Sequence, residues 1–325
     1  PWLGSESAYF LCANRNKRSL TVDIATASGQ QVIRELAETA DVLLENFKVG
    51  TLERYELNPV DLLEANPRLI ICSISAFGQS GSRAAQPGYD AMIQASGGLM
   101  SITGSADEEN GGPQKVGVAI ADIMAGMYAT TAILAALHAR EQTGRGQHID
   151  VPLYDSQVAW LANQSMNFLV GGTVPGRMGT AHPNLVPYQA FPTRDGNLML
   201  AVGNDRQFAA CAACLGQSEL ARDDRFATNK ARIRNRVELI VIFRKCLQQH
   251  TTAHWLNVFA QAGIPSGPIN DIGEVLTNDY AHERQFVRHL ENAVGNSVPT
   301  VSNPVSFADT PVTYAAAPPM LGNTP

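Results

Sequence analysis

No stretch of the 325-residue sequence concentrates positive charge enough to suggest a nucleic-acid groove. Its 24 lysines and arginines are outnumbered by 30 aspartates and glutamates. A nucleic-acid groove needs clustered lysine and arginine side chains, and an anionic membrane attracts the same basic residues. We therefore expect neither nucleic acid nor a membrane as a partner.

Long apolar runs are also missing. The longest uninterrupted apolar-to-neutral stretch covers residues 123–137, which is shorter than the roughly 20 residues needed to cross a bilayer. We expect a buried helix there. A signal-peptide pattern is absent as well, and the chain begins at Pro1 without a methionine, so we expect that an N-terminal piece is missing. A Walker loop and a strand followed by GxGxxG are not found either.

Cysteine is scarce, and its number is odd: Cys12, Cys72, Cys211, Cys214 and Cys246. Scattered, odd-numbered cysteines predict reduced thiols, and thus the cytoplasm or the mitochondrial matrix. Two of them form a CxxC, but no second Cys or His pair accompanies it. We interpret this pair as small core side chains and expect no metal site.

Hydrophobic residues make up 45% of the sequence, which is enough to form a large core. The length of the chain predicts two domains, or one large domain with a smaller insertion. Residues 19–24 alternate as a strand, 32–40 follow helical spacing, and 42–44 and 69–74 are short β-rich runs. This order predicts an α/β fold with a Rossmann-like parallel sheet and right-handed crossovers.

Further along, residues 88–104 are glycine-rich and predict a loop, and 148–153 predict a strand. Between them, an apolar helix is expected from near Asp122 to residue 138 or 140. For TGRGQ (143–147) a helix C-cap and turn are favoured over a catalytic role.

The second half of the chain predicts a smaller α+β domain. A hairpin is expected from 188–191 and 197–202, around Asp195 and Gly196. Helices are expected near 206–215, 236–249 and 252–262. The predicted domains are the following: a large α/β domain over 1–170, a linker over 171–187, the small domain over 188–292 and a return segment to the large domain over 293–325.

Asp122 is the only charged residue between Val116 and Leu137. An unpaired charge in apolar surroundings is costly, so this carboxylate must be neutralised, hydrogen-bonded or used. As a nucleophile or base it would have space beside Ala121, Ala125 and Gly126, and the helix start would keep it ionised. The alternative is a structural role, because aspartate is a favoured N-cap residue.

Three predicted strands end in VDIA, ENFK and SAFG. Ligands of parallel sheets bind beyond the carboxyl ends of the strands, so these loops are expected to converge on a ligand. The basic residues Arg15, Lys17 and Arg18 precede their strand and are expected at the opposite pole, as a solvated or subunit-contacting patch.

Seven stretches together resemble class III CoA-transferases, the family that includes formyl-CoA transferase and α-methylacyl-CoA racemases. They cover nearly the whole chain and are, in order, NRNKRSLTVDI, DVLLENFKVGTLERYEL, NPRLIICSISAFGQSG, GYDAMIQASGGLMSITG, VGVAIADIMAGMYA, TGRGQHIDVPL and VPYQAFPTRDG.

The resemblance implies that Asp122 is a catalytic nucleophile that forms a mixed anhydride with an acyl group and then an aspartyl-CoA thioester. It implies an interlocked homodimer, acyl-CoA and a carboxylic acid as substrates, and no tightly bound cofactor. It also assigns CoA contacts to the following residues: Val22, Asp23, Ile24, Ala25, Asn46, Phe47, Lys48, Arg54, Ser75, Ala76, Phe77 and Gly78.

The sequence departs from the family in two places. Family members begin with a further strand and a CoA-contacting loop, which are absent before Pro1. Formyl-CoA transferase has a run of glycines over its active site, where this chain has Thr180 to Asn184 (TAHPN). TAHPNLVPYQAF is more similar to succinyl-CoA-dependent dicarboxylate transferases, and this favours succinyl-CoA as donor and a C4 or C5 diacid as acceptor.

Two other functions remain open. The related racemases have His where this chain has Tyr89, and Tyr is a poor base near neutral pH because its pKa is about 10. Racemisation is therefore the second expectation. A catalytically inactive CoA-binding protein is the third.

Overall fold

The computed structural model describes residues 1–106 and 111–322. Contacts divide the chain into two compact units, residues 1–23 with 269–325 and residues 24–268. The predicted return segment pairs with the first of these stretches, because the N–H of Asn16 donates to the carbonyl of Ala316. The three terminal residues of that segment lie outside the described residues. The predicted domain boundaries stay a prediction.

The first unit is small and has a core around Leu11, Val298 and Ala317. Two antiparallel hairpins and three short helices form it. Their bounds are as follows: β1 (Trp2–Leu3), β2 (Glu6–Ser7), α1 (Ala8–Ala13), α14 (Ile272–Thr277), α15 (Asp279–Glu283), β9 (Val287–Glu291) and β10 (Ser297–Val301).

The second unit contains the predicted parallel sheet, in the order β3-β4-β5. Its strands are β3 (Val42–Glu45), β4 (Ile70–Ser75) and β5 (His148–Pro152). The central strand β4 is apolar and almost completely buried, as a parallel strand covered on both faces should be. The α/β prediction is therefore confirmed. Helix α2 (Ala27–Thr39) precedes β3, and α3 (Thr51–Arg54) and α4 (Pro59–Ala65) connect β3 to β4.

The strand predicted over 19–24 is wrong. No strand is assigned there. A six-residue alternation suits a strand only if a neighbouring strand supplies hydrogen bonds. Ser19 instead accepts a bond from the N–H of Gly322.

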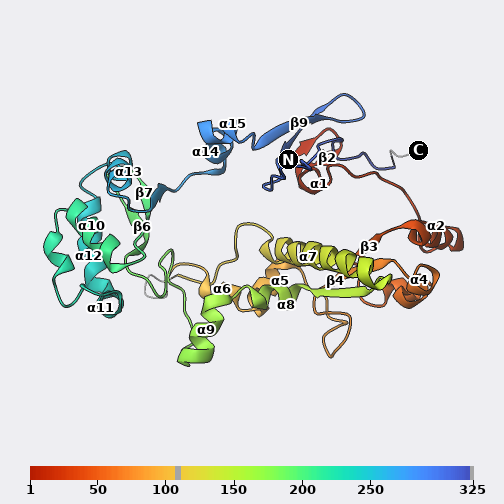
Figure 1. Cartoon of the computed structure of the whole chain (residues 1–325), viewed down its shortest axis with the longest axis horizontal. Helices are drawn as coiled ribbons and strands as arrows, with labels where there is room; N and C mark the ends of the chain where they lie inside the picture. The colour runs from red at the N-terminus through yellow and green to blue at the C-terminus, as the bar shows by residue number, and fades with distance from the viewer. Residues whose placement is uncertain (107–110, 323–325) are drawn as a thin grey trace. The chain divides into compact units, whose positions relative to one another are not determined.

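Four helices accompany the sheet: α5 (Asp90–Ser96), α6 (Leu99–Ile102), α7 (Ile120–Thr143) and α8 (Leu153–Ala159). The loop predicted over 88–104 is thus wrong, since two short helices begin within it. Helix α7 contacts β4 and β5, along which it runs in Figure 1. A stripe of small side chains, Ala121, Ala125 and Ala129, packs there with Cys72 and Val151.

Most of α7 is not covered by this chain, so the expectation of a buried helix is wrong. Only 22% of its most apolar stretch is buried, and by length and composition the helix could cross a membrane. Ile123, Met127 and Leu134 are each at least half exposed. Helix α9 (Ala162–Gly171) also exposes large apolar side chains, including Leu169 and Val170.

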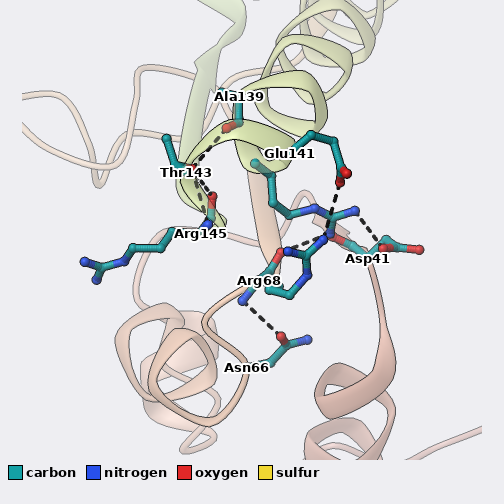
Figure 2. Close-up of polar contacts among 8 residues, drawn as sticks. Asp41, Asn66, Arg68, Ala139, Glu141, Thr143 and Arg145 are labelled. Carbon is teal, nitrogen blue, oxygen red and sulfur yellow. Dashed lines mark hydrogen bonds and ion pairs between the residues drawn. The ribbon is translucent and has the colours of Figure 1, made fainter.

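TGRGQ is a C-cap and turn, as predicted. Gly144 has a φ of 71°, in the left-handed region, and its N–H closes α7 on the carbonyl of Arg140. Gly146 passes so close to Leu69 that a Cβ atom would overlap the Leu69 carbonyl. Figure 2 shows Thr143 bonded to Ala139 and Arg145 around this turn, and the side chain of Arg145 extends away from the other labelled residues.

The predicted hairpin is present as β6 (Tyr188–Pro192) and β7 (Asn197–Ala201), joined by β8 (Ser266–Pro268) in a second sheet. Cys211 and Cys214 lie in α10 and pack in the adjoining core, so the prediction of small core side chains is confirmed. All five cysteines are free. The other helices of this part are η2 (Ser218–Ala221), α10 (Asp205–Cys214), α11 (Asn229–Arg234), α12 (Arg236–Leu247) and α13 (Thr252–Gln261).

Candidate active site

Asp122 is the third residue of α7, not its N-cap. The N-cap is Ala119, whose side chain makes no capping bond. Ala121 and Ala125 are buried against the sheet, so they do not provide the expected space beside the carboxylate. Gly126 provides such space, because it lies one turn after Asp122 on the same face of the helix, and a Cβ atom there would meet nothing within 4 Å. Asp122 itself is exposed.

Two effects raise the pKa of the Asp122 carboxyl above its usual value. The larger is partial burial, and the second is the negative charge of Asp90. The helix N-terminus, which was expected to hold this carboxylate in its charged form, acts in the opposite direction. Burial and Asp90 make the Asp122 carboxylate a stronger base than it would be without them.

Two of the predicted CoA loops leave neighbouring strands. Residues 46–48 follow β3, and Ala76 to Gly78 follow β4, whose last residue is Ser75. The strands are parallel and in contact, so both loops leave the same edge of the sheet. Lys48 also lines a hollow of about 10 Å³ together with Ser73 and Gln79. Arg54 ends α3 on the exposed surface.

The loop after β4 is held in a defined shape. The N–H of Gly78 donates to Ser75 Oγ at 2.9 Å, and the N–H of Gln79 donates to Asp150 Oδ2 at 2.8 Å. Gly78 has a φ of 90°. A side chain there would also press on the Asp150 carboxylate. Ala76 and Phe77 pack against the cluster that contains Ala121 and Ala125, so this loop and the start of α7 share one core.

The remaining predicted CoA contacts, residues 22–25, fall on both sides of the boundary between the two units. Val22 and Asp23 belong to the first unit, whereas Ile24 and Ala25 begin the second. In the first unit, Arg15 donates to the carbonyl of Val301 and lies over the ring of Tyr314.

A cavity of about 620 Å³ in the first unit is lined by Phe286, Arg288 and Tyr314. None of the predicted site residues lines this cavity, so its size alone does not identify it as the reaction site.

Sequence reasoning missed Arg83. Its guanidinium lies 3.7 Å from the ring centroid of Phe77 and 4.9 Å from that of Tyr154. Such a stacked, planar cation beside a predicted CoA loop suits a phosphate or carboxylate. Asp90 and Asp150 were missed as well. Their partners are 31 and 71 residues away, and no local pattern signals such pairs.

His182 lies in the segment that the sequence predicts as a linker, residues 171–187. Its Nδ1 accepts a bond from the N–H of Asn184, and its ring lies beside that of Tyr188. Burial, and secondarily the charge of Arg236, lower its pKa. The imidazole is therefore neutral near pH 7 and holds the 182–184 turn.

Comparison with known proteins tests the resemblance. The family model of CoA-transferase family III matches residues 2–324. The chain is 44% identical over 316 residues to succinate–glutarate CoA-transferase of Agrobacterium fabrum, covering 97% of this chain and 78% of that protein. It is 39% identical over 322 residues to human succinyl-CoA:glutarate CoA-transferase, covering 99% of this chain and 73% of the human protein.

Solved structures of two other proteins are similar to nearly the whole chain. A CaiB/BaiF family protein from Brucella suis has a TM-score of 0.83 at 43% identity, over 97% of this chain and 82% of that one. Rv3272 from Mycobacterium tuberculosis, in its orthorhombic form, has a TM-score of 0.86 at 28% identity, over 96% of this chain and 83% of that one. The resemblance read from the seven stretches is confirmed, and with it the expectation of a transferase enzyme: the chain belongs to CoA-transferase family III.

Proposed function

We propose that this enzyme moves CoA from succinyl-CoA to a C4 or C5 dicarboxylic acid, with Asp122 as nucleophile. The observation that carries the proposal is the position of Asp122. Its carboxylate is exposed in the first turn of α7, while its neighbour Ala121 shares a core cluster with the Ala76–Phe77 loop. Two relatives named above act on succinate and glutarate, which supports the choice of substrates.

The chemistry is an exchange of acyl groups in four steps. First, an Asp122 oxygen attacks the thioester carbon, the C–S bond breaks, and a mixed anhydride and CoA thiolate form. Second, the thiolate attacks the Asp122 carbonyl carbon, the C–O bond breaks, and succinate leaves from an aspartyl-CoA thioester.

In the third step the acceptor carboxylate attacks this thioester, which releases the thiolate and leaves a second anhydride. In the fourth, the thiolate attacks the acceptor acyl carbon and frees the Asp122 carboxylate. The exchange consumes no proton and no water. Exclusion of water is essential, since water would hydrolyse the anhydrides.

CoA enters as a substrate, with no tightly bound cofactor in the proposal. Asn46, Phe47, Ala76 and the backbone of the Gly78 turn would contact its pantetheine arm. Lys48 and Arg54 would pair with its phosphates because a cation beside a sheet edge attracts them. Val22 to Ala25 complete the proposed CoA contacts.

The assembly we propose is an interlocked homodimer. Ile123, Met127 and Leu134 on α7 and Leu169 on α9 are all exposed in the single chain. Large apolar side chains exposed in this way are typical of a protein interface. The free cysteines support a reducing compartment, the cytoplasm or the mitochondrial matrix.

The decisive experiment is mass spectrometry of the protein after incubation with succinyl-CoA. Hydroxylamine should convert Asp122 to a hydroxamate, and borohydride should reduce it to the alcohol. Asp122→Asn is the control and should give neither product. An unmodified Asp122 peptide in the active wild-type enzyme would overturn the mechanism. Exchange of the α-proton of a 2-methylacyl-CoA in deuterated water, without an acid acceptor, would instead favour a racemase.

A further inference from the structure

Asp90 and Gln94 connect the helix α5 to the turn that precedes Asp122. Asp90 Oδ1 accepts a hydrogen bond of 2.8 Å from the N–H of Ala121. Asp90 Oδ2 accepts one of 2.7 Å from Gln94 Nε2, and Gln94 Oε1 accepts one of 2.9 Å from the N–H of Val116. The start of α7 is therefore fixed at two points five residues apart, by side chains of another helix.

These bonds replace a cap that α7 does not supply. The first N–H groups of any helix lack partners within it, and here the N-cap residue Ala119 has no side-chain acceptor. Asp90 satisfies the N–H of Ala121 from outside. Gln94 is fully buried, so breaking its two bonds would leave unpaired amide atoms in the core. This arrangement resists rotation of the turn.

Asp90 also acts through its charge. Its negative charge raises the pKa of the Asp122 carboxyl, in addition to the larger effect of burial. Other titratable side chains on the elements packed against α7 do not contribute to that shift: Cys72 on β4, His148 and Asp150 on β5, and Tyr154 and Asp155 on α8.

We propose that Asp90 is a positioning residue for the nucleophile. With Gln94 it fixes the 116–121 turn, and its negative charge favours the acylated states of Asp122 over the free carboxylate. Acylation removes the charge of Asp122, so the repulsion between the two carboxylates is relieved when the anhydride or the aspartyl-CoA thioester forms. This inference rests on the proposed function.

Two substitutions separate the bond to Ala121 from the charge. Asp90→Asn retains an oxygen for the Ala121 N–H but loses the charge and the acceptor for Gln94 Nε2, whereas Asp90→Ala loses all three. We expect Asp90→Asn to shift the acid limb of the pH–rate profile to lower pH and to reduce the fraction of enzyme trapped as aspartyl-CoA. For Asp90→Ala we expect in addition a fall of about 100-fold in kcat with little change in KM, because the nucleophile is misplaced.

Asp195→Asn is the matched control. Asp195 Oδ1 accepts the N–H of Thr252, the first residue of α13, also at 2.8 Å, but Asp195 does not affect Asp122. The pH–rate profile of Asp195→Asn should match that of the wild type. If Asp90→Asn also leaves the acid limb and the trapped fraction unchanged, the proposal is wrong. The same holds if Asp195→Asn shifts them equally.

A readout without turnover separates this inference from the proposed function. Carbon-13 NMR of labelled aspartate, assigned by the missing signal in Asp122→Asn, should show a lower Asp122 pKa in Asp90→Asn. Hydrogen exchange at the Ala121 amide should accelerate in Asp90→Ala but not in Asp90→Asn. If wild-type enzyme forms no adduct, the proposed function fails while these two results still decide the role of Asp90. Unchanged titration and exchange would overturn it.

Discussion

The guanidinium of Arg140 lies 2.8 Å from the carboxylate of Asp41, and this contact attaches the last turn of α7 to the start of β3. Arg140 is buried, and its Nη1 also donates to the carbonyl of Arg68 at 3.0 Å. Figure 2 shows Asp41, Arg68 and Glu141 at this junction. Helix α7, which carries Asp122, is thus held at both ends, by Asp90 at its start and Arg140 near its finish.

Arg140→Met should destabilise the protein by about 1–3 kcal/mol, since a buried carbonyl loses its donor while the aliphatic volume is retained. Urea unfolding measures this. Arg145→Met is the control, because Arg145 is exposed and its guanidinium extends away from the other labelled residues in Figure 2. Its substitution should change the stability by less than about 0.5 kcal/mol. Equal effects of the two substitutions would contradict the role given to Arg140.

Gly146→Ala should also destabilise the fold, by about 1–3 kcal/mol, because the new methyl group must displace the backbone of Leu69 at the start of β4. Gly171→Ala is the matched control. Gly171 is helical, and a Cβ atom there meets nothing within 4 Å. Thermal unfolding of both variants checks this, and a stable Gly146→Ala protein would show that the strand can move aside.

The sequence could single out Asp122 as a candidate because a lone charge in an apolar run is visible without any structure, and the catalytic role came from the family resemblance and stays a prediction. It could place β3 and β4 because short β-rich runs between helices are typical of parallel sheets. Asp90 could not be found in this way, since its partner Ala121 is 31 positions away. The strand expected over 19–24 failed for a related reason: alternation describes the faces of a strand but does not supply a neighbour to pair with it.

The exposure of α7 illustrates the same limit. Its composition is that of a core helix, yet only one stripe of it packs within the chain. An apolar sequence indicates that a helix will be buried. It does not indicate whether the same chain or another molecule buries it.

Arg83→Ala should raise the KM for succinyl-CoA about tenfold while kcat changes little, if the guanidinium on Phe77 contacts a phosphate of CoA. The salt dependence of KM should weaken with it, because one ionic contact is lost. Arg83→Lys retains the charge without the planar group and should be intermediate. Steady-state kinetics at two salt concentrations measure both effects. A fall in kcat alone would show that Arg83 supports the loop and does not bind CoA.

Asp122→Asn should abolish transfer, with a loss of at least about 10⁴-fold, because the nucleophilic oxygen is replaced by an amide. It should also raise the thermal stability slightly near pH 7. The pKa of Asp122 is raised in the fold, so its ionised form opposes folding at pH values above that pKa.

The extra stability of Asp122→Asn should decrease as the pH falls through the raised pKa of Asp122. It should vanish below about 3.9, the ordinary pKa of aspartate, because the carboxyl is then protonated in both the folded and the unfolded protein. The dipole of α7 acts in the opposite direction and would make the carboxylate stabilising. Thermal unfolding of wild type and variant at neutral and acid pH therefore decides which effect is larger. A variant that is less stable than the wild type at pH 7 would show that the dipole outweighs burial and Asp90.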